Sequence, residues 1–152
     1  MKNKPKSYIT ILLIFISFIT MTLNAQDLDS HQWENRILIV HTTNRNNIDF
    51  KKQLKIFKDD QIGLIERKLV LYKIINNQFE LTNFKDSNPI ESGDISKRFE
   101  NKYVKHKNDF TIMLLGLDGS IKLQKQKIVS IDELFSLIDS MPMRRREMKR
   151  NN

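Results

Sequence analysis

Short runs of branched apolar residues, each bounded by polar residues, recur along the chain from residue 36 onward. The run at Arg36–Thr42 (RILIVHT) and the run at Lys68–Ile75 (KLVLYKII) predict buried strands. Phe110–Leu117 (FTIMLLGL) predicts a third strand. The Asp118-Gly119 pair after it favours a two-residue hairpin turn, so Ser120–Gln124 is expected to pair back as a fourth strand.

Apolar residues at helical spacing lie between these strands. Asp49 is expected to cap a first helix that ends at Gly63. Its apolar positions are Phe50, Leu54 and Phe57. Asp94–Tyr103 predicts a second helix. The polar stretch between, Gln78–Gly93, is expected to be irregular, with at most a short strand at Phe79–Leu81.

A third helix is predicted near the end of the chain. Ser130 and Glu133 have the spacing of a capping box, and the apolar positions of Ile131–Met141 share one helix face. Pro142 lacks the N–H that would continue the hydrogen-bond ladder, so the helix should kink or restart there.

The predicted order is β-α-β-α-β-β-α. A strand, a helix and a strand in close succession indicate a parallel crossover, and the later hairpin adds antiparallel strands. The sequence therefore predicts an α/β fold of thioredoxin-like arrangement, with a four-stranded mixed sheet and helices on both faces. The expected core residues are Ile37, Ile39, Leu69, Leu71, Ile112, Leu114, Leu134, Phe135 and Ile138.

The first 25 residues have the layout of a secretory signal. A start with three lysines is followed by an apolar run at Tyr8–Leu23 and by Ala25, a small residue suited to cleavage. We expect removal of residues 1–25, export to the periplasm or outside the cell, and no membrane span afterwards. The alternative is an uncleaved anchor, although the run is short for a spanning helix. One domain at 26–143 and a basic tail at 144–152 would remain.

The composition restricts the chemistry. The chain has no cysteine, which excludes thiol redox chemistry by its own side chains and a lipid anchor on cysteine. Its formal charge of +8 comes largely from the two ends, since Arg144–Arg150 (RRREMKR) has five basic residues and one acidic residue. These cations could complement a helix end or adhere to an acidic polymer or lipid head groups. Nucleic acid is an unlikely partner for an exported chain. We expect the tail to be dispensable for folding.

Four stretches resemble the domain-of-unknown-function family 4174. They are WENRILIV at 33–40, GLIERKLVLYKI at 63–74, DFTIMLLGLDGSIKL at 109–123, and IDELFSLIDSMPMRRREM at 131–148. The family is identified as a set of bacterial relatives of the DUDES-type thioredoxin-like domains of vertebrate extracellular matrix proteins. The resemblance implies a thioredoxin-like or peroxiredoxin-like fold and an extracytoplasmic location, and it implies no established activity.

The resemblance directs attention to the corner after the first strand. Thioredoxins place a cysteine pair there, and a cis-proline before the third strand. Here the corner is Thr42–Asn47, and Asn108-Asp109 stands at the proline position. Arg45 beside a helix N-terminus could form a pocket for an anion, with Thr43, Asn44 and Asn46 as further ligand-binding residues. The alternative is that Arg45 is an ordinary surface arginine of a loop.

The other polar residues suggest no cofactor and no metal. His31, His41 and His106 lack the spacing of metal ligands, and His41 is expected to be packed at the end of its strand. His41 and Thr43 could share a face, but nothing in the sequence completes a catalytic triad. We therefore assign no catalytic residue.

The function predicted from the sequence is that of an exported, non-catalytic binding module of thioredoxin-like fold. Its partner would be an unknown protein or an anionic component of the cell envelope. The alternative is an enzyme of cysteine-independent chemistry at the Thr42–Asn47 corner.

Overall fold

The computed structural model describes residues 28–86, 88–104 and 108–150. The predicted signal at 1–25 and the third histidine, His106, lie outside the described residues. Among the described helices, none combines the length and the apolar character needed to cross a bilayer.

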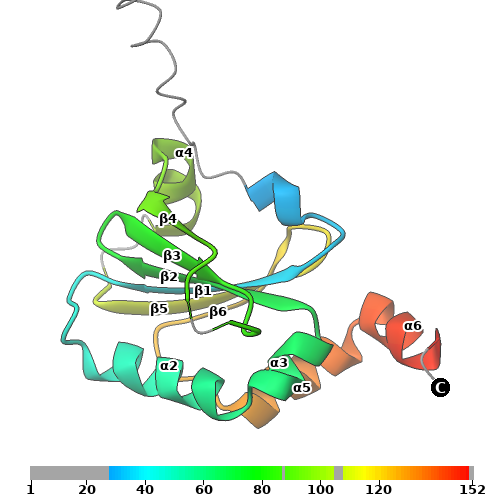
Figure 1. The fold of residues 1–152 in the computed structure, drawn as a ribbon. Helices are drawn as coiled ribbons and strands as arrows, with labels where there is room; N and C mark the ends of the chain where they lie inside the picture. Colours follow the sequence, from blue (N-terminus) through cyan, green and yellow to red (C-terminus); the bar gives the residue numbers. More distant parts are fainter. Residues whose placement is uncertain (1–27, 87, 105–107, 151–152) are drawn as a thin grey trace, which may run out of the picture.

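A mixed sheet of six strands forms the centre of the fold, in the order β4-β3-β2-β1-β5-β6 (Figure 1). β1 and β2 pair in parallel, and every other neighbouring pair is antiparallel. The strands are β1 (Arg36–Thr42), β2 (Leu69–Ile75), β3 (Gln78–Thr82), β4 (Glu91–Asp94), β5 (Phe110–Leu115) and β6 (Ile121–Lys125). The four strands β2, β1, β5 and β6 reproduce the predicted arrangement, with the parallel crossover and the hairpin in their expected places.

The prediction of only four strands was wrong, because β3 and β4 extend the sheet beyond β2. In β3 the buried residues Phe79 and Leu81 alternate with exposed ones, which confirms the short strand expected at 79–81. β4 has the sequence ESGD and is exposed throughout. No apolar pattern marks such a strand, and only its hydrogen bonds to β3 define it.

Helices cover both faces of the sheet, as predicted. The helical elements are η1 (Leu28–His31, 3-10), α2 (Ile48–Asp59), α3 (Gln61–Glu66), α4 (Lys97–Phe99), η2 (Glu100–Val104, a π turn), α5 (Ile131–Ser140) and α6 (Pro142–Arg150). α2, α3 and α5 lie on one side of the sheet and α4 on the other (Figure 1).

Several predicted helix ends differ from the structure. The first helix ends at Asp59, and a separate α3 contains Gly63 instead of stopping at it. The side chain of Asp60 caps α3 by accepting from the Gly63 N–H at 3.3 Å. A Cβ at position 63 would lie 2.5 Å from the Phe135 ring, so the glycine permits close packing of α3 on α5. The second helix starts after Ser96, because Asp94 belongs to β4.

The third predicted helix is confirmed. The hydroxyl of Ser130 accepts from the backbone N–H of Glu133 at 3.2 Å, as a capping residue does. α5 ends at Ser140, and a new helix begins at Pro142.

Two apolar clusters pack against the two faces of the sheet. Leu38 and Val40 of β1 contact the helices α2, α3 and α5 on one face, whereas Ile37 and Ile39 belong to the cluster that includes Phe99 and Tyr103. The predicted core residues are buried with the exception of Phe135, which is half-buried. The guanidinium of Arg67 covers the Phe135 ring, 3.9 Å from its centroid.

Residues 144–150 of the predicted basic tail are helical, and the first arginine of the tail is buried. Arg144 is 2% exposed and binds the carboxylates of Glu66 and Asp139. Glu147 of the same helix receives a hydrogen bond of 3.2 Å from the buried Arg36 of β1. These contacts join α6 to the domain, so we no longer expect the segment to be dispensable for stability.

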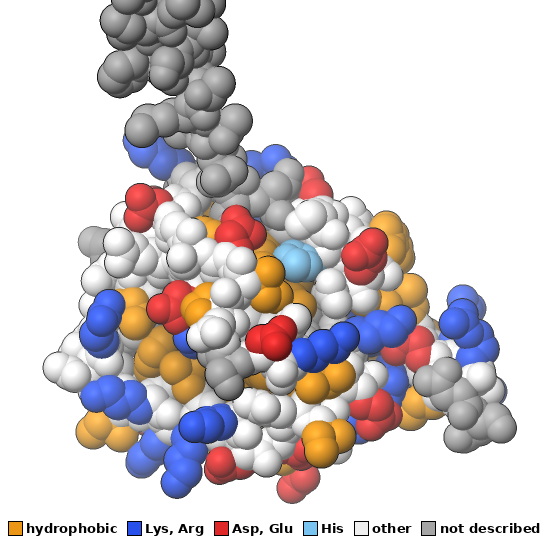
Figure 2. All heavy atoms as spheres, in the orientation of Figure 1, with side chains coloured by type: hydrophobic (Ala, Val, Ile, Leu, Met, Phe, Trp, Pro, Cys, Tyr) orange, Lys and Arg blue, Asp and Glu red, His pale blue; other side chains and the backbone are white. Residues whose placement is uncertain are grey.

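The electrostatics of this cluster follow from the contacts. Burial alone would raise the pKa of Asp139, but hydrogen bonds from Arg67 and Arg144 outweigh burial and lower it. Burial likewise acts to lower the pKa of Arg144, while its bonds to Glu66 and Asp139 raise the pKa overall. On the face shown in Figure 2, basic and acidic side chains are interspersed over the sheet and its helices.

Candidate functional site

The corner between β1 and α2 is held together by hydrogen bonds within the chain. Thr42 is buried, and its hydroxyl donates to the backbone carbonyl of Asp109 at 2.6 Å. The same oxygen accepts from the backbone N–H of Asn44 at 3.1 Å. Because the hydroxyl proton is committed to a carbonyl, Thr42 is poorly placed to act as a nucleophile.

Asn47, and not Asp49, caps the helix. Its side-chain oxygen accepts from the backbone N–H of Phe50 at 2.9 Å, and its side-chain nitrogen donates to the Asp109 carbonyl at 3.2 Å. Asn47 precedes the first helical residue, as a cap must, whereas Asp49 lies inside the first turn. The Asn47 side chain therefore already binds the Phe50 N–H, one of the free N–H groups of the first turn that were expected to bind an anion.

Thr42 and Asn47 both bind the carbonyl of Asp109, one of the two residues expected at the position where thioredoxins have their cis-proline. The described residues contain no cis peptide bond. The corner and the start of β5 are therefore joined directly, through a hydroxyl and an amide.

Three of the predicted ligand-binding residues serve the turn itself. Thr43 donates to the Asp109 carboxylate at 3.3 Å, and the Asn44 side chain accepts from the backbone N–H of Asn46 at 2.9 Å. The Asn46 side chain accepts from the ammonium of Lys51 at 3.2 Å. The side chains of Thr43, Asn44 and Asn46 are exposed, but each already has a partner.

Arg45 differs from its neighbours. It is exposed, and within the described part of the chain its guanidinium has no hydrogen-bond or ion-pair partner. It lies at a groove of about 440 Å³ between α2 and the strands β2, β3 and β4. The apolar lining includes Phe50, Leu54 and Ile75.

Charged side chains of both signs also line this groove. Lys73 of β2 forms an ion pair with Glu80 of β3, and Asp94 of β4 adds a second carboxylate. The register places Lys73 opposite Glu80 and Gln78 opposite Asp94, so these side chains share one face of the sheet. Arg45 is therefore the groove's unpaired cation among the described residues.

Sequence reasoning found Arg45 but missed the groove, because the groove depends on the two added strands. One signal was present. Lys73 is a charged residue at a core-facing position of an otherwise apolar strand, where the helix layer leaves part of the sheet open.

The two described histidines, His41 and His31, are packed or hydrogen-bonded within the fold. His41 is 2% exposed, and its burial lowers the pKa of the imidazole. His31 makes a hydrogen bond of 2.8 Å with the Tyr72 hydroxyl. No hydrogen bond joins His41 to Thr43, and no three metal-ligating side chains converge anywhere in the described ranges.

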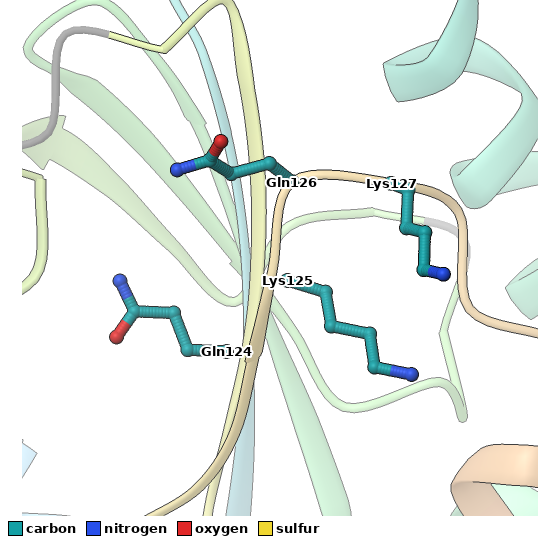
Figure 3. Close-up of a pocket in the computed structure, with 4 residues that line it drawn as sticks. All are labelled: Gln124, Lys125, Gln126 and Lys127. Atoms are coloured by element: carbon teal, nitrogen blue, oxygen red, sulfur yellow. The ribbon is translucent and has the colours of Figure 1, made fainter.

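An open hollow beside the end of β6 does not have the features of a binding site. It is lined by four consecutive residues, Gln124, Lys125, Gln126 and Lys127. Figure 3 shows the two lysines extending to one side of the chain and the two glutamines to the other. Lys125 is paired with Glu133, so the polar groups diverge and do not form a site.

Comparisons with known proteins agree with this fold. A family model described as "Domain of unknown function (DUF4174)" matches residues 27–147. Among solved structures, the reduced 2-Cys peroxiredoxin of Plasmodium vivax is similar, with a TM-score of 0.54 and 11% sequence identity. The match covers 80% of this chain and 84% of the peroxiredoxin. At this identity the likeness shows a shared thioredoxin-like fold and nothing about activity.

Proposed function

For a chain that belongs to the DUF4174 family, has a thioredoxin-like fold and lacks cysteine, we propose a role as a non-catalytic binding module. Its ligand site is the groove between α2 and the β2-β3-β4 edge, and Arg45 binds an acidic group there. The ligand is part of a protein or of an anionic polymer of the cell envelope.

One observation carries the proposal. Each polar side chain of the corner has at least one hydrogen-bond partner within the described chain, except Arg45, whose guanidinium lies at the groove. An exposed guanidinium beside apolar side chains suits a carboxylate carried on a partly apolar chain, because it offers a fork of N–H donors.

The arrangement favours binding over cysteine-independent catalysis. A nucleophile needs a base within hydrogen-bond reach, and the hydroxyl of Thr42 donates instead to the backbone carbonyl of Asp109. Asp109 could accept a proton from Thr43, but their 3.3 Å contact is exposed and lacks an orienting third group. We therefore expect neither disulfide reduction nor peroxide turnover.

Binding of a short polyglutamate peptide tests the proposal, with polyglutamine as the uncharged comparison. We expect Arg45→Ala to weaken polyglutamate binding by about 1.5–3 kcal/mol, the range for hydrogen bonds to charged groups. Added salt should weaken it as well, because Arg45 is exposed. Lys52→Ala is the matched control, since Lys52 is an exposed cation of α2 that does not line the groove.

Equal loss from Lys52→Ala and Arg45→Ala would indicate general charge attraction and refute a site at the groove. Steady peroxide consumption by the purified chain would refute the non-catalytic role.

Export belongs to the same proposal. The three-part layout of residues 1–25 and the predicted kinship with DUDES-type extracellular domains support it. Intact-mass measurement of the chain from the cell envelope should give a species that begins at Gln26. A species retaining residues 1–25 would indicate a membrane anchor instead.

A further inference from the structure

A second cavity lies at the other end of β1, away from the corner. It has a volume of about 430 Å³ and is bounded by the elbow between α5 and α6 and by the turn between β5 and β6. Most of its lining is apolar, from Leu117, Leu137, Met141, Pro142 and Met143. A volume of this size suits a small molecule.

Arg36 of β1 also lines this cavity, and its guanidinium is only partly satisfied. The residue is 1% exposed. Its Nη1 donates to the Arg67 carbonyl at 2.9 Å and to Glu147 at 3.2 Å. Its Nε and Nη2 atoms are buried and have no hydrogen-bond partner among the described residues. Buried N–H groups without acceptors are rare and costly, so they call for an explanation.

The unpartnered atoms form one edge of the guanidinium. The Nε and Nη2 atoms together present two parallel N–H donors, which is the geometry that binds a carboxylate through both of its oxygens. The opposite group, Nη1, already has two acceptors. Arg36 therefore keeps a complete donor pair for one further anion.

The cavity lies on the β5 side of Arg36. Arg67 precedes β2, which pairs with β1 on one side, and β5 pairs with β1 on the other. Nη1 donates to the Arg67 carbonyl on the β2 side, whereas Gly116 and Leu117 follow β5 and line the cavity together with Arg36.

The acidic side chains near Arg36 are already paired with cations, so they do not prevent the binding of an anion. Glu147 lies near two other cations besides its bond to Arg36, Arg144 at 3.6 Å and Lys68 at 3.9 Å. Asp118, the acid that lines the cavity, binds Lys122 at 2.9 Å. The hydrogen bond from Lys122 lowers the pKa of Asp118 to about 2, so this carboxylate stays charged and paired.

We propose that this cavity binds a small molecule with an apolar body and a carboxylate head group. The carboxylate accepts from Nε and Nη2 of Arg36, and the apolar body lies along Leu117, Leu137 and the elbow. Since the two nitrogens are covered, the head group displaces side chains to reach them. Met141 and Met143 are the lining side chains best suited to move, because the thioether chain is unbranched and flexible.

Titration calorimetry with sodium decanoate and 1-decanol tests the proposal. The two probes share an apolar body and differ in the carboxylate. We expect decanoate to bind at least roughly tenfold more tightly than decanol, in line with hydrogen bonds to a charged group. Arg36→Met should abolish that preference. Arg146→Met is the control, since Arg146 is an exposed cation of α6 outside the cavity.

A second variant tests the site without touching Arg36. Ser140 is exposed at the rim of the cavity, so Ser140→Trp should fill the cavity without unfolding the chain. We expect it to weaken both probes. Every variant keeps the same N-terminal apolar segment, so binding by that segment cancels in the comparison. Equal affinity for the two probes, or decanoate binding unchanged by Ser140→Trp, would overturn the proposal.

The groove beside α2 and the cavity beside Arg36 can be tested separately. Arg45→Ala should leave decanoate binding unchanged, because Arg45 lines only the groove beside α2. Loss of decanoate binding in Arg45→Ala would contradict the separation of the two sites.

Discussion

Replacing Arg144 with methionine should destabilise the fold, although the residue stands in a run of three arginines near the C-terminus. Methionine keeps much of the apolar stem and removes the guanidinium. The guanidinium binds Glu66, the Glu66 carbonyl at 3.3 Å, and Asp139 at 3.1 Å. It is buried, so water cannot replace these bonds in the folded wild-type chain.

The expected loss of unfolding free energy is about 1.5–3 kcal/mol, the range for hydrogen bonds to charged groups. Removing one partner of a fully buried ion pair costs about 3–5 kcal/mol, because the other charge is left unpaired. Here the loss is smaller. Asp139 keeps two bonds from Arg67, at 3.0 and 2.6 Å, and the side chain of Glu66 is 61% exposed and rehydrates.

Urea unfolding at neutral pH measures the effect, with Arg145→Met as the matched control. Arg145 is exposed on the same helix, so its replacement should change stability by less than about 0.5 kcal/mol. The pKa of Asp139 is lowered in the folded state, so its contribution is present above the unfolded value of 3.8 and is lost as pH falls. The difference between wild type and Arg144→Met should therefore shrink below about pH 4. Equal effects of the two substitutions would refute the reasoning.

Three further predictions follow from the burial and the caps. Leu71→Ala should cost about 2–5 kcal/mol in urea unfolding, because it leaves a cavity in the buried strand β2, whereas Ile62→Ala at an 83% exposed position should cost little. Because burial lowers the pKa of His41, the free energy of unfolding should fall as pH drops below 6.5. His41→Phe should flatten the pH profile of unfolding between about pH 7 and 5, and an unchanged slope would contradict the role of His41. Asn47→Ala should cost about 1 kcal/mol through loss of the cap, with the exposed Asn46→Ala as a near-neutral control in the same thermal or urea measurement.

Much of the layout was predictable because it rests on local patterns. Three continuous apolar runs, one Asp-Gly turn and a capping box at Ser130 specify strands and a helix whose partners are few, given short right-handed connections. The order β2-β1-β5-β6 follows from them. The same patterns identified the corner and Arg45, since a strand followed by polar residues and a helix marks such a turn by itself.

The outer strands could not be predicted in the same way. β4 has no apolar residue, and it exists as a strand because its backbone pairs with β3. The groove beside Arg45 depends on that pairing, so it too is absent from the sequence pattern. The cap at Asn47 was missed because Asn47 and Asp49 are equally good capping residues by type, and only the backbone decides which one precedes the first turn.

The C-terminal arginines show most clearly which features the sequence determined and which ones only the tertiary structure decided. The sequence alone determined that the chain has no redox cysteine, that its C-terminal segment is basic and that three apolar runs form buried strands. In the run Arg144–Arg146, the three side chains are chemically identical. Only the tertiary structure decided that Arg144 is buried between α3 and α5 while Arg145 and Arg146 face water, because the direction of a side chain on a helix has meaning only relative to what the helix packs against.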